Sequence, residues 1–231
     1  MCHGAAVAAF PQPATAEEFS SSVDGYRYTG KGSRKVAILP DIYGCNAFYR
    51  GLATHLSQKG ATVFLVDPFA RLGNLPEQTR EAAFSRRAKV ADKLFVDQLE
   101  SFTREERLDG VIGFCLGGLY IFELARRGLE AKLVGLYGFP QGLPNSDPLP
   151  PPFDYLRDVV QPFTMLMGAQ DEAVGVENIS RLEGMAPEAP AMTLKVYQGV
   201  GHNFLPLLDS EDNAKRSIAR DALDEIERVV A

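Results

Sequence analysis

The stretch Gly113-Phe114-Cys115-Leu116-Gly117-Gly118 lies between an apolar run typical of a strand, residues 111–113, and one typical of a helix, residues 116–125. A sharp turn from strand to helix strains the backbone of its central residue, and glycines two positions away on either side avoid clashes. Cys115 would then begin a helix, where backbone N–H groups and the helix dipole stabilise a thiolate or an oxyanion. This placement favours a nucleophile over the alternative, a buried structural cysteine in a glycine-rich turn.

Apolar runs on both sides of this turn alternate between strand and helix patterns. Buried strands are expected at residues 35–39, 61–66, 111–113, 133–137, 163–167 and 194–197. Helices are expected after a cap at Asn46 and up to Gly60, at 116–125, near 176–185, and after a cap at Ser210. The alternation predicts an α/β fold with one mainly parallel sheet and helices on both faces.

Two further segments complete the expected organisation. After Pro76, six apolar residues are spaced 4, 3, 4, 4 and 3 apart, which predicts one long helix with a buried stripe: Phe84, Ala88, Ala91, Phe95, Leu99 and Phe102. Residues 1–25 carry little pattern, so we expect an irregular N-terminal arm, followed by a short edge strand at 26–29. Residues 26–231 contain no repeat, linker or break in composition and are expected to form a single domain.

Composition excludes several classes of function. A net charge of −6 over 231 residues argues against a general nucleic-acid binder, and no run reaches the ~20 apolar residues of a membrane span. The three cysteines, Cys2, Cys45 and Cys115, form an odd set without metal-ligand spacing, which indicates thiols in a reducing compartment. The first basic residue is Arg27, so the positive segment of a secretory signal is missing and a cytoplasmic location is expected.

Two candidate partners for Cys115 each follow an expected strand. Asp171 comes after residues 163–167 and His202 after 194–197, which places both where open parallel sheets bind ligands. In this interpretation His202 takes the thiol proton and later activates water, while Asp171 orients the imidazole ring. The alternatives are an aspartate that caps a turn and a histidine of a surface loop.

The other two histidines follow no strand. His3 lies in the expected arm, and His55 stands beside the apolar stripe of the first helix, which is typical of a packing histidine.

An oxyanion hole requires two N–H donors. Leu116 follows the nucleophile and supplies one, and Ile42, in the loop after the first buried strand, is expected to supply the other. Asp41 in the same loop puts a carboxylate near the thiol or caps a turn.

These motifs resemble the dienelactone hydrolase (carboxymethylenebutenolidase) family of the α/β-hydrolases, from about Lys35 to the final helix. The motifs that carry the resemblance are Asp41-Ile42-Tyr43-Gly44-Cys45-Asn46, Val66-Asp67-Pro68-Phe69-Ala70-Arg71, Gly113-Phe114-Cys115-Leu116-Gly117-Gly118, Gly168-Ala169-Gln170-Asp171 and Gly201-His202-Asn203-Phe204. The resemblance implies a triad of Cys115, His202 and Asp171 that hydrolyses a lactone to an open-chain acid, without a metal or an organic cofactor.

The chain departs from the family at two positions. Asp41 stands where family members that act on dienelactone carry a glutamate beside the resting nucleophile, and Pro206 replaces one of two arginines that bind the substrate carboxylate. Arg80 matches the other arginine, and Tyr43 is a second candidate for substrate binding. Proline offers neither a charge nor an N–H group, although Arg50 or Arg71 could replace the arginine from neighbouring loops. We therefore predict that neutral esters or thioesters are hydrolysed at least as well as dienelactone.

The function favoured by the sequence is hydrolysis of a small ester, lactone or thioester through an acyl intermediate on Cys115. The alternative is a non-catalytic or redox-sensing protein that keeps the fold and a reactive Cys115, although a sensor requires no histidine and carboxylate in this order. The expected partner is a small molecule, with no nucleic acid and no membrane, and the chain is expected to be a monomer or a homodimer.

Overall fold

The computed structural model describes residues 6–231, so Cys2 and His3 lie outside the described part. One sheet runs through the molecule in the order β1-β2-β4-β3-β5-β6-β7-β8. Its strands are β1 (Glu17–Ser20), β2 (Asp24–Tyr28), β3 (Lys35–Leu39), β4 (Thr62–Val66), β5 (Gly110–Phe114), β6 (Lys132–Leu136), β7 (Phe163–Gly168) and β8 (Met192–Tyr197). The pairings β1–β2 and β2–β4 are antiparallel, and all the others are parallel.

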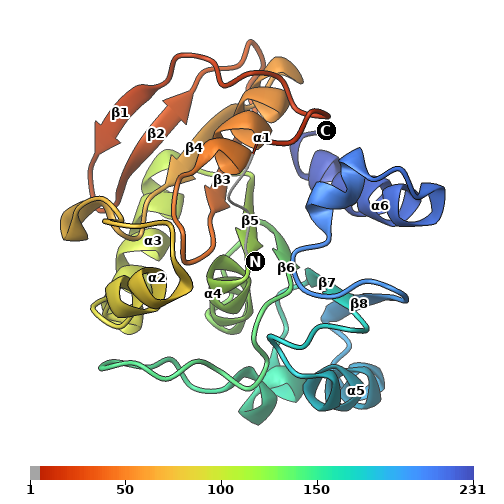
Figure 1. The fold of residues 1–231 in the computed structure, drawn as a ribbon. Helices are drawn as coiled ribbons and strands as arrows, with labels where there is room; N and C mark the ends of the chain where they lie inside the picture. The colour runs from red at the N-terminus through yellow and green to blue at the C-terminus, as the bar shows by residue number, and fades with distance from the viewer. Residues whose placement is uncertain (1–5) are drawn as a thin grey trace.

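Helices cover both faces of the sheet, which confirms the predicted α/β fold (Figure 1). The helices are α1 (Ala47–Gln58), α2 (Arg80–Arg87), α3 (Asp92–Glu106), α4 (Leu116–Arg126), α5 (Val176–Met185) and α6 (Asn213–Val230). In Figure 1, α1 and α6 lie on one side of the sheet, and α3 and α4 lie on the other. Within residues 6–231, no helix combines the length and the apolar character needed to cross a membrane.

Helix caps agree with the sequence at one end of the chain and differ at the other. The Asn46 side chain accepts the Phe48 N–H at 3.0 Å, as predicted for the first helix. The predicted cap at Ser210 is wrong, because Asp212 caps α6 and accepts the Ala214 N–H at 2.8 Å. The Ser210 hydroxyl instead accepts the Asp212 N–H at 3.2 Å, so it stabilises the turn that precedes the helix.

The predicted long helix after Pro76 is also wrong, because the chain breaks between α2 and α3. Ala91 is extended, with φ −81° and ψ 97°, and Arg87 pairs with Asp92 across the break. Both charged side chains are buried, and Tyr120 of α4 donates to the second Asp92 oxygen at 2.7 Å. A buried ion pair leaves no signature in apolar spacing, so the sequence pattern continued through the break.

The apolar stripe is correct only on the α3 side of this break. Phe95, Leu99 and Phe102 are buried, whereas Phe84 on α2 is 46% exposed. The apolar stripe therefore does not continue from α3 into α2, where Ala83 and Arg87 are buried instead.

The N-terminal segment joins the sheet, so the expectation of irregular chain up to residue 25 is wrong. The strand expected at 26–29 is present as β2, but it does not form the edge of the sheet. β1 forms the edge and β2 lies between β1 and β4. Phe19 supplies the anchor, because its ring stacks on Phe102 with centroids 5.2 Å apart and meets Phe64 edge-on at 5.4 Å. A single aromatic residue among polar neighbours is too little to mark a strand by periodicity.

The residues before β1 are also held in place. Phe10 is buried and meets Phe48 of α1 with ring centroids 5.5 Å apart. The backbone N–H groups of Ala8 and Ala9 donate to the two carboxylate oxygens of Asp209, the latter at 2.9 Å. The start of the described chain is thus tied to a segment about 200 residues away.

The turn between β5 and α4 depends on close backbone contacts. A Cβ atom on Gly117 would lie 2.3 Å from the carbonyl oxygen of Leu39, and one on Gly113 would lie 2.1 Å from that of Gly117. On Gly118 it would meet the Leu136 oxygen at 2.7 Å. Only glycine allows α4 to approach β3 and β6 this closely.

We therefore expect Gly117→Ala to lower the free energy of unfolding by about 3 kcal/mol, because the obstructing atoms belong to the backbone and cannot rotate away. Gly184→Ala in α5 is the matched control, since a Cβ atom there meets nothing within 4 Å. It should raise stability by about 0.5–1 kcal/mol through the higher helix propensity of alanine. Urea denaturation measures both changes, and a Gly117→Ala protein as stable as the wild type would contradict the described packing.

Candidate active site

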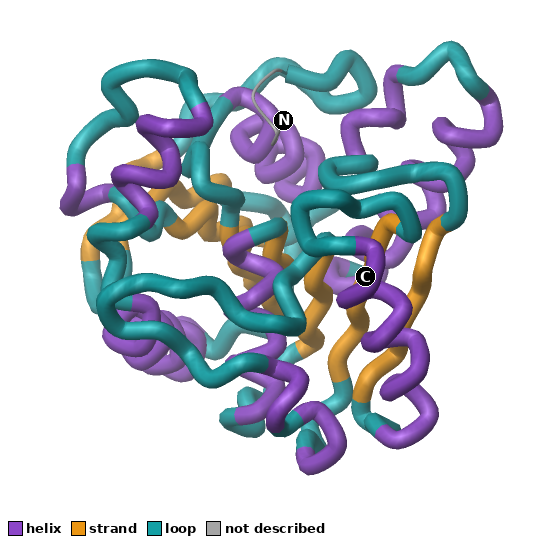
Figure 2. Tube along the Cα trace, turned by 60° about the horizontal axis from the view of Figure 1, so that its bottom comes forward, coloured by secondary structure: helices purple, strands orange, loops and turns teal. Residues whose placement is uncertain are grey.

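The candidate residues gather at one edge of the sheet. Parallel strands end on the same side, and the loops after β3, β5, β7 and β8 carry Asp41, Cys115, Asp171 and His202. Figure 2 shows the molecule turned by 60° from Figure 1, with the loops that connect strands and helices in teal. The loop after β6 extends towards α2, and the Asn145 amide donates to the Val90 carbonyl at 2.7 Å.

Cys115 occupies the strained turn that the sequence predicts. Its φ of 55° and ψ of −105° lie in a region that side-chain-bearing residues rarely adopt, at a cost of about 1–3 kcal/mol. The Cys115 N–H donates to the Leu136 carbonyl at 2.9 Å, which ties the turn to the end of β6. Leu116 is the first residue of α4, where backbone N–H groups lack partners within the helix.

Asp171 and His202 are joined directly. His202 Nδ1 lies 2.8 Å from Asp171 Oδ2, and the carboxylate is fully buried. The other oxygen, Oδ1, accepts the N–H groups of Ala173 and Val174 at 3.0 and 2.9 Å. Asp171 therefore caps a turn and orients the histidine at the same time, so the two interpretations of this residue are compatible.

Glycines bring these two loops together. A Cβ atom on Gly168 would lie 2.5 Å from the Gly201 oxygen, and one on Gly201 would lie 2.8 Å from the Gln170 oxygen. The Gln170 N–H also donates to the Val200 carbonyl at 2.9 Å. This backbone contact fixes the distance between the two loops before their side chains interact.

Two aromatic rings flank the imidazole. The Tyr137 and Phe139 rings lie 5.2 and 5.9 Å from the His202 ring, between centroids. Tyr137 has a positive φ of 43° and donates its N–H to the Leu166 carbonyl at 2.9 Å. Aromatic side chains are common in the core and gave no signal for a site in the sequence, although Tyr137 directly follows β6 just as the candidate residues follow their own strands.

The loop after β3 forms a compact turn around Asp41. Its carboxylate oxygen Oδ1 accepts the Tyr43 N–H at 2.8 Å, and its carbonyl accepts the Gly44 N–H at 3.0 Å. Its own N–H donates to the Tyr49 hydroxyl at 3.2 Å. Asp41 thus caps this turn, and the expected effect of its carboxylate on the Cys115 thiol stays a prediction.

An arginine that no sequence motif marks contacts this loop. Arg86 Nη2 donates to the Ile42 carbonyl at 3.2 Å, and its guanidinium lies over the Phe69 ring, 4.2 Å from the centroid. Arg80, the predicted substrate arginine, begins the same helix but is exposed, with its guanidinium 5.3 Å from the Phe84 ring centroid. The spacing of charges along α2 does not distinguish these two arginines.

The two suggested substitutes for the arginine missing at Pro206 have other partners. Arg50 Nε donates to the Cys45 carbonyl at 2.9 Å, and its guanidinium lies 3.9 Å from the Tyr26 ring centroid. Arg71 Nε pairs with Asp24 at 2.9 Å. Both guanidinium groups are thus already bound to other residues of the protein and not placed to replace the missing arginine.

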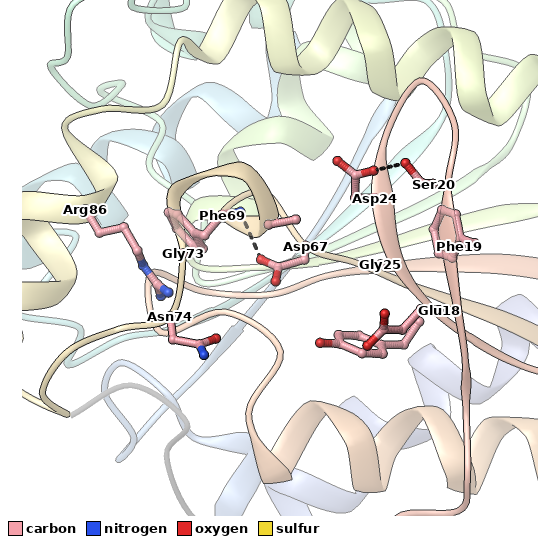
Figure 3. A pocket seen from close by; sticks show the side chains of 12 residues that line it. Glu18, Phe19, Ser20, Asp24, Gly25, Asp67, Phe69, Gly73, Asn74 and Arg86 are labelled. Carbon is pink, nitrogen blue, oxygen red and sulfur yellow. Dashed lines mark hydrogen bonds between the residues drawn. The ribbon is translucent and has the colours of Figure 1, made fainter.

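Figure 3 shows a pocket next to this region, between the β1–β2 hairpin and the end of β4. Its volume is about 370 Å³, and its walls include Glu18, Asp24, Asp67, Phe69 and Arg86. Burial raises the pKa of the Asp67 carboxyl group. None of the three candidate catalytic side chains lines this pocket, but Arg86 belongs both to its wall and to the contact with Ile42.

The other cysteine and the other histidine of the described chain, Cys45 and His55, have structural roles and lie outside the candidate triad. Burial raises the pKa of the Cys45 thiol well above its ordinary value, which keeps this sulfur protonated and weakly nucleophilic. His55 Nε2 lies 2.8 Å from Glu227, which confirms the predicted packing histidine with a satisfied partner.

The strand order, the turn at Cys115 and the loops after β7 and β8 define an α/β-hydrolase. The family model described as the dienelactone hydrolase family matches residues 23–228, and the chain belongs to that family. Carboxymethylenebutenolidase 2 of Cupriavidus pinatubonensis is 46% identical over 96% of both chains. A carboxymethylenebutenolidase of Rhodococcus opacus is 30% identical over 84% of this chain and 79% of its own length.

Structural comparison supports the fold independently. A crystal structure from Klebsiella pneumoniae superimposes with a TM-score of 0.77 at 20% identity, covering 94% of this chain and 98% of the other. With the family established, the protein is a hydrolase, and the alternative of a non-catalytic sensor is set aside.

The double contact of Asp171 predicts a stability effect separate from catalysis. Asp171→Ala removes the acceptor of two backbone N–H groups and should lower the free energy of unfolding by about 1–3 kcal/mol. Asp171→Asn keeps a side-chain oxygen and should cost less than about 1 kcal/mol, while exposed Glu172→Ala serves as the control. Chemical denaturation compares the three, and equal losses for the alanine and asparagine variants would argue against the capping role.

Proposed function

We propose that this lactone hydrolase opens lactones of the carboxymethylenebutenolide type through an acyl intermediate on Cys115. The observation that carries the proposal is the hydrogen bond from His202 to buried Asp171, at the edge where Cys115 occupies a strained turn. The names of the relatives at 46% and 30% identity point to the same substrate class.

In the first step His202 accepts the Cys115 proton, and the thiolate attacks the lactone carbonyl carbon. Asp171 holds Nδ1 of the ring, which leaves Nε2 as the base and stabilises the imidazolium that forms. The new C–S bond converts the carbonyl oxygen to an oxyanion. The N–H groups of Leu116 and Ile42 are the proposed donors to this oxygen.

Collapse of the tetrahedral intermediate breaks the ring C–O bond. The departing oxygen takes the proton from His202, which leaves a thioester on Cys115 and an open-chain product still attached through its acyl group. Water then gives a proton to His202 and attacks the thioester, and the thiolate leaves and is reprotonated. One water molecule is consumed and one carboxylic acid is released.

The aromatic rings around His202 support this assignment. Tyr137 and Phe139 place apolar surface against the imidazole, whose side chain is only 12% exposed. A ring shielded from bulk water interacts more strongly with its carboxylate partner, because the local dielectric constant is low.

The three proposed catalytic residues should act as a unit. Cys115→Ala should abolish lactone hydrolysis, and His202→Gln should lower kcat by ~10³-fold. Adding Asp171→Asn to His202→Gln should cost little more, because a carboxylate without its histidine has nothing to orient. Steady-state kinetics on one lactone measures all variants.

His55→Gln is the matched control, since this histidine pairs with Glu227 away from the site and should leave kcat unchanged. Multiplicative losses for the His202 and Asp171 changes would contradict a shared mechanism. Iodoacetamide should label Cys115 before Cys45, because the Cys45 thiol stays protonated, and activity should fall as Cys115 is labelled. If the loss of activity follows labelling of Cys45 instead, the assignment of Cys115 as nucleophile is wrong.

We expect the enzyme to show little preference for dienelactone, which carries a carboxylate, over a neutral lactone. A charge-assisted hydrogen bond is worth about 1.5–3 kcal/mol, or roughly ten- to a hundredfold in binding, but Pro206 provides none and Arg80 is exposed. We expect a neutral lactone of similar size to reach a kcat/KM at least equal to that of dienelactone. A hundredfold preference for the carboxylated lactone would contradict this, and Arg80→Met would then show whether that residue anchors it.

A further inference from the structure

We propose that Arg86 is a positioning residue that fixes the loop between β3 and α1, residues 40–46 (the early loop), so that the Ile42 N–H stays directed at the reacting carbonyl oxygen. The inference rests on the proposed function, in which Ile42 is an oxyanion donor. It concerns a residue of α2 that contacts the loop from outside and acts on the substrate only through it.

The peptide group between Ile42 and Tyr43 is held at both of its ends. Its carbonyl oxygen accepts from Arg86 Nη2 at 3.2 Å, and its N–H donates to Asp41 Oδ1 at 2.8 Å. Because a peptide group is planar and rigid, two such bonds on opposite sides fix its orientation. The torsions at Ile42 then have little freedom, and the direction of the Ile42 N–H is set with them.

Arg86 is itself fixed by contacts that depend on the shape of the loop. Its guanidinium lies 4.2 Å from the Phe69 ring centroid, and the Phe69 N–H donates to Asp67 at 2.9 Å. Gly44 has a φ of 75°, and a Cβ atom there would lie 3.4 Å from both Arg86 Nη2 and the Phe69 ring. The glycine leaves the space through which the guanidinium reaches the Ile42 carbonyl.

The surroundings of Arg86 favour orientation over a stabilising ion pair. Asp67 and Asp41 attract the charge of this guanidinium, but within residues 6–231 no carboxylate lies within ion-pair distance of it, and its Nε is buried without an acceptor. Burial lowers the pKa of this guanidinium, so its charge is held at a cost. The charge-assisted hydrogen bond from this half-buried cation to the Ile42 carbonyl therefore fixes the orientation of that carbonyl.

The expected kinetic effect follows from the role of an oxyanion donor. Loss of one such donor costs about 10²–10³-fold in kcat, and a loosened donor should cost part of that. We expect Arg86→Met to lower kcat by about 10–100-fold with KM within about threefold of the wild type, because the contact is used only after the oxyanion forms. The methionine keeps apolar contact with Phe69 and loses the donors.

Two reagents separate this role from general damage to the site. A substrate-like aldehyde forms a hemithioacetal with Cys115 and uses the oxyanion hole, so its affinity should fall in proportion to kcat. Alkylation of Cys115 by iodoacetamide forms no oxyanion, so its rate should stay within about threefold of the wild type. Lys89→Met removes an exposed cation just beyond α2 and is the matched control.

Unchanged kcat in a folded Arg86→Met protein would overturn the inference, and so would a rise in KM alone or a parallel loss of alkylation. If this variant does not fold, Arg86→Gln, which keeps a neutral donor, takes its place in the same assays. The proposed function is judged separately: a wild type that does not hydrolyse the lactone, or lactone turnover that survives Cys115→Ala, would defeat it. A wild type that passes beside an unaffected Arg86→Met enzyme would defeat the Arg86 inference alone.

Discussion

The structure depends on the close approach of backbone to backbone around Cys115. Gly113, Gly117 and Gly118 let α4 begin directly against the ends of β3 and β6, at distances that admit no Cβ atom. This approach places Cys115 in its strained conformation and sets the first N–H groups of α4 beside the early loop. The same device recurs at Gly168 and Gly201, where two loops meet through their main chains. The site is therefore defined first by the backbone, and its side chains occupy positions already fixed.

Much of the fold and the candidate site could be predicted because both follow from local patterns. Buried parallel strands are short apolar runs, and in such a sheet the residues after each run must share one edge, which located Cys115, Asp171 and His202. What the sequence concealed depends on contacts between distant residues. Phe19 of β1 stacks on Phe102 of α3, and Arg87 at the end of α2 pairs with Asp92, which also accepts a hydrogen bond from Tyr120. The roles of Arg80 and Arg86 likewise depend on which ring lies beneath each guanidinium.

The buried group of Arg87, Asp92 and Tyr120 connects parts of the site that are far apart in the chain. Arg87 follows Arg86 at the end of α2, and Tyr120 lies on α4 just beyond the nucleophile turn. Removing one partner of a buried ion pair typically costs about 3–5 kcal/mol, because the other charge is left buried and unpaired. The group joins the end of the helix that carries Arg86 to the helix that begins after Cys115. The two proposed oxyanion donors lie one in each of the regions that it connects.

The hydrogen bonds from Ala8 and Ala9 to Asp209 link the first described residues to the segment that follows His202. Asp209 ends the short helical turn Leu205–Asp209, which begins three residues after His202 and contains Pro206. Because this turn directly continues the loop that carries His202, residues 198–204, the N-terminal segment supports that loop. A fusion partner or a shortened N-terminus that displaced residues 8 and 9 would remove this support without touching any of the candidate catalytic residues. Protein engineering that attaches a tag or a second domain here therefore acts on the loop that carries His202.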